Sequence, residues 1–250
     1  ESLGVVASER ELGLSEEHDG ISERPAGEMG QAFADYLAEQ DPARVDPVIE
    51  IAITPNRPDA LGVRGVARDL AARGLGVMKP NDVDPVAASF ANPITVTIDD
   101  DTLAQAPVFY GRLIKGVKNG PSPDWLQQQL RAIGLRPISF LVDVTNWFTY
   151  DLNRPLHVFD ADKINGSSLR LHRATGTETL MGLDDTEYTL PEGATVISDG
   201  QGPESIGGVM GGLATGCTAD TTSVFVEAAY FDPIRTAYTR RGLKINSDAR

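Results

Sequence analysis

The pattern of hydrophobic and polar positions predicts a small helix–strand region in the first third of the chain. Apolar residues recur at helical spacing within residues 29–39, and residues 61–73 predict a second helix that ends at Gly74. Between these helices, the apolar run 47–54 predicts a strand. The two prolines of segment 55–59 predict a stiff turn directly after that strand, because proline fixes its own φ angle.

Beyond residue 93 the pattern changes to short strand-like runs separated by glycine or paired aspartates. Ser122 and Pro123 predict a helix with a serine N-cap and a proline at its first position. Asp232 and Pro233 predict a closing helix that runs through Arg241. We therefore predict fold class α+β, with a strand-rich second half. The predicted strands are 94–98, 108–117, 169–173, 186–190, 194–198 and 223–229.

Segment 80–93 separates these two regions. It contains three prolines and four Asp or Asn residues among small side chains. This composition is typical of a linker, so we predict two units, residues 1–85 and 86–250. The chain begins at Glu1 rather than at a methionine. We expect it to be a piece of a longer polypeptide, with the second unit truncated at its C-terminal end.

Charge is unevenly distributed along the chain. The formal net charge is −14, and residues 1–50 hold 13 acidic against 3 basic side chains. The final twenty residues are locally basic, so a phosphate backbone could still be bound there, although a mixed solvated surface explains the charges equally well. No apolar run approaches the roughly 20 residues of a membrane span, and no signal peptide is evident.

Several familiar chemistries find no support in the sequence. Neither a phosphate-binding loop of the Walker type nor a His-Glu-x-x-His motif is present, and no serine nucleophile elbow occurs. His18, His157 and His172 are scattered, and the single Cys217 cannot supply a zinc cluster. A lone cysteine rules out an internal disulfide and fits a reducing compartment. We interpret Cys217 as an incidental thiol.

One carboxylate stands out, because Glu227 interrupts the apolar run 224–231 that follows a glycine-rich hairpin at 207–212. Burying an ionised carboxylate without a partner costs several kcal/mol. Glu227 therefore lies either at the edge of a strand or in a site.

Other polar residues sit within apolar surroundings at 142–147, 154–160 and 246–249, and each has an ordinary structural explanation. Asp143 and Asn146 could cap a helix, and His157 could be a core imidazole with its hydrogen bonds satisfied. Ser247 could simply belong to a loop. The case for a site therefore depends on whether these segments come together.

Taken together, these segments resemble the β subunit of bacterial phenylalanyl-tRNA synthetase. The order and spacing agree over nearly the whole chain. On this resemblance, residues 1–85 would hold the end of an oligonucleotide-binding domain and part of a helix–strand domain, and residues 86–250 would form an editing module. The segments that carry the resemblance are 51–59, 63–68, 122–126, 142–147, 155–160, 208–212, 227–231 and 247–250.

In that family the editing module hydrolyses tyrosine wrongly attached to the phenylalanine tRNA. The resemblance implies that Glu227 accepts the hydrogen of the tyrosine phenol, and that the backbone amides of the glycine hairpin are candidate donors to the oxyanion. The residues implied to act in catalysis are Thr145, His157 and Ser247, and those implied to contact substrate are Glu227, Asn146, Arg136, Gly211, Gly212 and Ala249.

The sequence departs from the family at three places. Asn153-Arg154 stands where the family usually has Gly-Gln, and Ser139-Phe140 replaces a usual Asn pair. Ser247 keeps the hydroxyl, but not the methyl group, of a frequent threonine.

The resemblance also implies partners and cofactors for the full enzyme. These are a synthetase α subunit in a heterotetramer of two α and two β chains, the acceptor end of the phenylalanine tRNA, and ATP with Mg²⁺ at a synthetic site outside this chain. No cofactor or metal is expected within the chain itself. The expected location is the cytoplasm, with no membrane association.

Two functions remain open from the sequence. The first is a hydrolytic editing module, and the second is a non-catalytic architectural or tRNA-docking part of the β subunit. The first requires Glu227, His157, Thr145 and Ser247 to line one cleft. A third possibility, an unrelated hydrolase, is disfavoured because the sequence shows no nucleophile–base pair.

Overall fold

A computed structural model describes residues 7–12, 14, 18–23, 27–45 and 47–245. It contains two compact units, Glu1–Val48 and Ile49–Arg250. The first unit holds helix α1 (Phe33–Gln40), as its helical spacing predicted, and the 3₁₀ turn η1 (Pro42–Val45). The boundary predicted at residue 85 divides the chain by domain type, whereas the boundary after Val48 divides it by compactness. The boundary at residue 85 stays a prediction.

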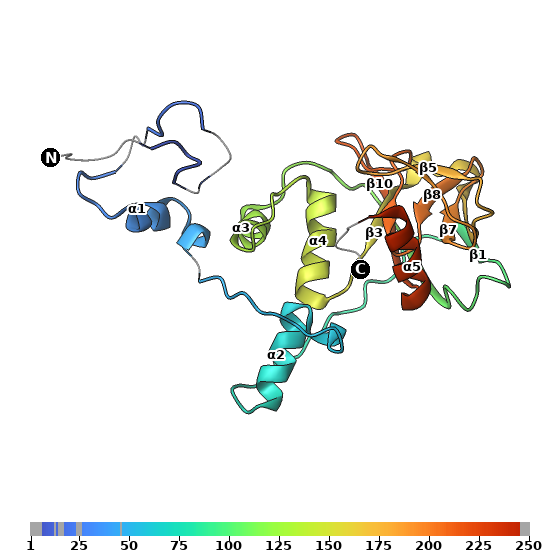
Figure 1. Cartoon of the computed structure of the whole chain (residues 1–250), viewed down its shortest axis with the longest axis horizontal. Helices are drawn as coiled ribbons and strands as arrows, with labels where there is room; N and C mark the ends of the chain where they lie inside the picture. The colour runs from blue at the N-terminus through green and yellow to red at the C-terminus, as the bar shows by residue number, and fades with distance from the viewer. Residues whose placement is uncertain (1–6, 13, 15–17, 24–26, 46, 246–250) are drawn as a thin grey trace. The chain divides into compact units, whose positions relative to one another are not determined.

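The second unit contains the sheets (Figure 1). The largest has five strands in the order β1-β4-β7-β8-β9, in which β1 and β4 run parallel and the other neighbours are antiparallel. A separate two-stranded ribbon pairs β5 (Thr179–Met181) with β6 (Glu187–Thr189). The five strands are β1 (Thr95–Ile98), β4 (Ser168–Arg173), β7 (Thr195–Ser198), β8 (Pro203–Ile206) and β9 (Met210–Gly211).

A three-stranded antiparallel sheet carries the polar residues of interest. It consists of β2 (Val108–Lys115), β10 (Ser223–Tyr230) and β3 (His157–Asp160), with β10 in the middle. Glu227 on β10 is directly opposite His157 on β3 and Gly111 on β2. Residues that are opposite one another point to the same face of a sheet, so the side chains of Glu227 and His157 are neighbours.

The main core lies between the three-stranded and the five-stranded sheets. Phe159 and Phe225 from the smaller sheet pack with Leu169, Leu171 and Ile197 from the larger one, and all five are fully buried. Burial of each such side chain stabilises the fold by about 1.5–3 kcal/mol.

Four α-helices and three 3₁₀ turns complete the described part of the second unit. The closing helix begins as predicted, because Asp232 accepts a hydrogen bond from the amide of Arg235 at 2.7 Å. For the helix predicted to begin at Ser122, the serine N-cap is wrong. The N-cap residue of this helix is Pro123, and Ser122 Oγ donates instead to Asp143 Oδ2 at 2.5 Å. The α-helices are α2 (Val63–Ala72), α3 (Asp124–Ala132), α4 (Phe140–Leu152) and α5 (Pro233–Leu243), and the 3₁₀ turns are η2 (Pro58–Ala60), η3 (Ala161–Lys163) and η4 (Asn165–Ser167).

Two further features differ from the sequence-based prediction. The run 47–54 forms no strand among its described residues, and Val48 and Ile49 are 64% and 78% exposed. An apolar run becomes a strand only where another strand pairs with it, and none does here. Conversely, the polar segment 142–147 lies within helix α4, which the periodicity did not reveal. Within the described ranges, no helix is long and apolar enough to cross a membrane.

Candidate functional site

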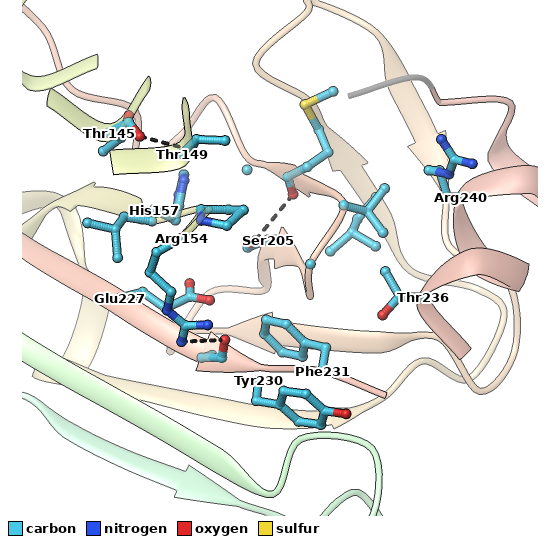
Figure 2. Close-up of a pocket in the computed structure, with 18 of the residues that line it drawn as sticks. Thr145, Thr149, Arg154, His157, Ser205, Glu227, Tyr230, Phe231, Thr236 and Arg240 are labelled. Atoms are coloured by element: carbon cyan, nitrogen blue, oxygen red, sulfur yellow. Dashed lines mark hydrogen bonds between the residues drawn. The ribbon is translucent and has the colours of Figure 1, made fainter. Parts of the chain in front are cut away.

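A pocket of about 650 Å³ opens beside the end of the three-stranded sheet (Figure 2). Helix α4, the connection from α4 to β3, the β8–β9 hairpin, β10 and helix α5 all contribute to its wall. Residues Pro58 and Leu61 complete it, so the pocket extends beyond the predicted unit 86–250. The predicted site residues that line it are Thr145, Asn146, His157, Gly211 and Glu227.

Glu227 is buried, with 6% of its surface exposed, and its Oε2 atom has no hydrogen-bond partner. Burial raises the pKa of this carboxyl to about 7, and the nearby charge of Arg154 acts in the opposite direction. At neutral pH the group is therefore divided between its charged and neutral forms. It offers a buried acceptor whose hydrogen bond only a ligand or water can supply.

His157 lies beside Glu227 with its ring held edge-on to Phe159, at 4.4 Å between ring centres and 90° between planes. Its Nε2 atom is buried and has no hydrogen-bond partner. Burial lowers the pKa of the imidazole to about 4, so His157 is neutral at pH 7. Two neighbouring polar atoms, one on each strand, thus remain unpaired within the same pocket wall.

The two threonine hydroxyl groups on helix α4 donate to the helix backbone. Thr145 Oγ1 donates to the carbonyl of Val142 at 2.7 Å, and Thr149 Oγ1 donates to the carbonyl of Thr145 at 2.9 Å. Because each hydroxyl has one proton, Thr145 can only accept a hydrogen bond from a ligand or water. Asn146 lines the same wall, and its side-chain amide can both donate and accept.

The glycine hairpin forms the opposite side of the pocket, and its two central glycines have different roles. A Cβ atom on Gly211 would lie 2.3 Å from Cε1 of His157, so only glycine allows this close approach. Gly212 is not among the lining residues. Its amide donates to the carbonyl of Glu204 at 2.7 Å, so in this structure the amide is engaged within the hairpin rather than directed at the pocket.

The remaining predicted site residues are Arg136, Ser247 and Ala249. Arg136 is exposed in the connection between α3 and α4 and does not line the pocket. Ser247 and Ala249 lie outside the described residues.

The sequence prediction also missed several residues of the wall. Arg154 could have been noticed, because it is one of the departures from the family pattern. Arg240 belongs to the basic C-terminal stretch. Tyr230 and Phe231 belong to segment 227–231, which carries the resemblance, whereas Ser205 and Thr236 carried no sequence signal.

The part of the chain that the structure describes holds no group of three or more His, Cys, Asp or Glu residues placed to bind a metal. The thiol of Cys217 is also a weak nucleophile, because burial raises its pKa to about 11. What the pocket offers chemically is a set of hydrogen-bonding groups that can orient a ligand hydroxyl and a water molecule.

Residues 105–250 match the family of B3/4 domains, and the chain belongs to this family. Over its full length it is similar to phenylalanine–tRNA ligase β subunits, which confirms the resemblance noted in the sequence. It is 66% identical to the one from Ruegeria pomeroyi and 58% identical to the one from Cereibacter sphaeroides. The chain is covered completely in both cases and spans 31% of each relative.

A more distant structural likeness links the chain to an N-terminal fragment of the phenylalanyl-tRNA synthetase β subunit from Pyrococcus horikoshii. The TM-score is 0.44 at 18% identity, with 86% of this chain and 68% of that fragment covered. This likeness is too remote to support an assignment of function.

Proposed function

We propose that the chain carries the editing pocket of a phenylalanine–tRNA ligase β subunit, which hydrolyses the ester of tyrosine mischarged on the phenylalanine tRNA. The observation that carries this proposal is the buried, unpartnered Oε2 of Glu227 in a pocket of 650 Å³. A site that hydrogen-bonds a substrate hydroxyl can reject the analogue without it by about 10⁴–10⁵.

The arrangement of Glu227 and His157 suits a phenol. The phenol would donate to Glu227 Oε2, and Nε2 of His157, if it carries the ring proton, would donate to the phenol oxygen. Tyrosine then satisfies two buried atoms that phenylalanine leaves unpaired. A hydrogen bond to a charged carboxylate is roughly twice as strong as a neutral one.

Hydrolysis in this pocket would depend on orienting a water molecule. A histidine with a pKa of about 4 is too weak a base to be obligatory at neutral pH, so His157 acts as a polar positioner. Thr145 can accept a hydrogen bond from the attacking water. The side-chain amide of Asn146 replaces Gly212 as a candidate donor to the oxyanion. A tRNA hydroxyl and Ser247 are further proposed contributors.

The proposed tRNA partner fits the charge of helix α5. This helix contains Arg235, Arg240 and Arg241, its C-cap residue is Lys244, and it has no acidic residue, although the whole chain has a net charge of −14. Arg240 lines the pocket itself, so phosphate contacts would begin at the opening. The α subunit, ATP and Mg²⁺ are proposed as partners of the full enzyme, whose synthetic site would lie outside this chain. The proposed location of that enzyme is the cytoplasm.

The alternative is a non-catalytic tRNA-docking part of the β subunit. It shares the family membership and the basic helix, but it gives no reason to bury an unpaired Glu227. The meeting of Glu227, His157 and Thr145 in one pocket supports the editing function.

The direct test is deacylation of Tyr-tRNA by this chain and by its Glu227→Ala variant. We expect Glu227→Ala to reduce the preference for the tyrosyl over the phenylalanyl ester by at least about 100-fold, because the acceptor for the phenol is lost. Glu187→Ala, at an exposed strand position, is the matched control and should behave as the unmodified chain. Equal deacylation by the Glu227→Ala variant would remove Glu227 from this role, whereas no deacylation by the unmodified chain would favour the docking alternative.

A further inference from the structure

Arg154 occupies a position in the pocket that the proposed function leaves unexplained. Helix α4 ends at Asn153, whose φ of 53° and ψ of 41° place it in the left-handed region. Glycine adopts this conformation most readily and asparagine is the next most tolerant residue, which is why Asn153 can stand where the resembling family has glycine. The chain then turns into Arg154 and runs on to His157.

This turn is fixed from outside the predicted unit 86–250. Asn153 Nδ2 donates to the carbonyl of Pro58 at 2.6 Å, a contact that glycine could not make. A Cβ atom on Gly62 would lie only 2.6 Å from the Asn153 backbone nitrogen and 3.0 Å from the Asp151 carbonyl oxygen. The start of α2 therefore packs directly against the end of α4 and holds the turn before Arg154 in place.

The side chain of Arg154 is braced at its other end by the central strand. Its Nη2 donates to the carbonyl of Ala229 at 3.0 Å (Figure 2). Ala229 is two residues beyond Glu227 on β10, so both lie on the same face of the strand. Arg154 acts electrostatically on Glu227, yet Glu227 Oε2 remains without a hydrogen-bond partner. Figure 2 shows the guanidinium beside the carboxylate, and the oxygen that a ligand would use stays free.

The other groups around Glu227 offer no equivalent charge. His157 on β3 is neutral at pH 7, and the residue opposite Glu227 on β2 is Gly111. The pocket-lining residues of α4 and of the hairpin have no ionisable side chains. Arg240 on α5 is the other cation in the pocket wall, but it is not among the groups that act on Glu227.

We propose that Arg154 is a positioning residue for hydroxyl recognition: braced on Ala229, its guanidinium favours the charged carboxylate of Glu227 as acceptor for the ligand. This inference rests on the proposed function and deepens it, because it names what keeps a buried acceptor charged. A cation within a few ångströms favours the charged form of a carboxylate by about one to three pH units.

Binding of two stable ligands to this chain tests the inference. The probes are the 3′-amide analogues of tyrosyl-adenosine and phenylalanyl-adenosine, measured by calorimetry from pH 6 to pH 9. For the unmodified chain, the preference for the tyrosyl probe should increase as pH rises through about 7, where Glu227 ionises. Arg154→Gln keeps a donor for Ala229 but removes the charge. We expect this variant to raise by about one unit the pH at which the tyrosyl preference increases.

The expected signature of Arg154→Gln is a loss of preference of about fivefold at pH 7 that recovers to within twofold at pH 9. Arg154→Lys retains the charge and should keep the original pH profile. An unchanged profile for Arg154→Gln, or an equal loss at every pH, would overturn the inference, because a packing role does not depend on pH. Failure of the proposed function would look different: the unmodified chain would show no tyrosyl preference at any pH.

Discussion

The junction of α3 with α4 and the pocket beside β10 each bury a carboxylate, with opposite results. Asp143 is fully buried at the junction, where Oδ2 accepts from Ser122 Oγ at 2.5 Å and Oδ1 accepts from the Ile138 amide at 2.8 Å. Glu227 is almost as buried, but its Oε2 accepts nothing. The first carboxylate is satisfied by the fold, whereas the second leaves a hydrogen bond for a ligand to make.

An unpaired oxygen alone does not identify a site, as a third carboxylate shows. Glu204 on β8 is also buried with an unpartnered Oε2, and burial raises its pKa. It does not line the pocket, so a substrate in that cavity would not reach it. Access to a cavity, together with a second unpaired group such as His157, separates a candidate site from a local defect of packing.

Filling the space next to Glu227 should produce the largest effect. Gly211→Trp places an indole where even a Cβ atom would lie 2.3 Å from the His157 ring. We expect deacylation of Tyr-tRNA to fall to background while circular dichroism shows a folded protein. Gly76→Trp is the control, because nothing lies within 4 Å of a Cβ atom there. Activity that survives in a folded Gly211→Trp protein would show that the hairpin is only a structural turn.

Removing the satisfied carboxylate should damage the fold rather than the chemistry. Asp143→Ala leaves the Ile138 amide and the Ser122 hydroxyl without their acceptor, and we expect a loss of about 3 kcal/mol in the free energy of unfolding. Denaturant titration measures this loss, with the exposed Asp100→Ala as control. If Asp143→Ala were as stable as the control, the contrast between the two carboxylates would fail.

The unpaired carboxylate should instead reduce stability at high pH. The pKa of Glu227 is about 7 in the folded chain against 4.5 for the free side chain, so its ionisation opposes folding as pH rises from 4.5 through 7. Glu227→Gln removes this ionisation and should stabilise the protein by about 2–3 kcal/mol at pH 8.

At pH 4 the carboxyl is protonated in both the folded and the unfolded chain, so Glu227→Gln should have almost no effect there. Unfolding curves at the two pH values test this difference, with the exposed Glu187→Gln as control. A destabilised Glu227→Gln protein at pH 8 would mean that Glu227 has a partner in the folded chain.

The smallest expected effect, the salt dependence of deacylation, distinguishes recognition of the tyrosine hydroxyl from binding of the RNA. The cations of α5 near the pocket are few, so deacylation of Tyr-tRNA should fall about tenfold between 50 and 200 mM salt. A small tyrosyl ester should be hydrolysed at a rate that changes less than twofold, because its recognition lies inside the pocket.

This chain should also deacylate Tyr-tRNA far less efficiently than a full synthetase. The remaining domains of that enzyme would deliver the acceptor end to the pocket. Equal efficiency at physiological salt would contradict the proposal that the chain holds tRNA weakly by itself.

Local sequence signals predicted those features that depend on neighbouring residues. The helix that begins at Asp232 and the 3₁₀ turn at Pro58 follow from the preferences of their own residues. The central strand and its isolated carboxylate were also evident. The prediction of a strand at 47–54 was wrong, because a strand forms only where a distant partner pairs with it. Helix α4 was missed, because its polar and apolar residues are mixed and its formation depends on distant packing partners.

The sequence by itself thus determined the fold class, the family and the unusual position of Glu227. Only the tertiary structure decided that Asp143 is paired and Glu227 is not, and that Gly211 rather than Gly212 faces the pocket. It also decided that Arg154 is braced between Pro58 and Ala229 through Asn153. Each of these outcomes depends on contacts between residues far apart in the chain. Local patterns do not encode which atom of a buried group will find a partner.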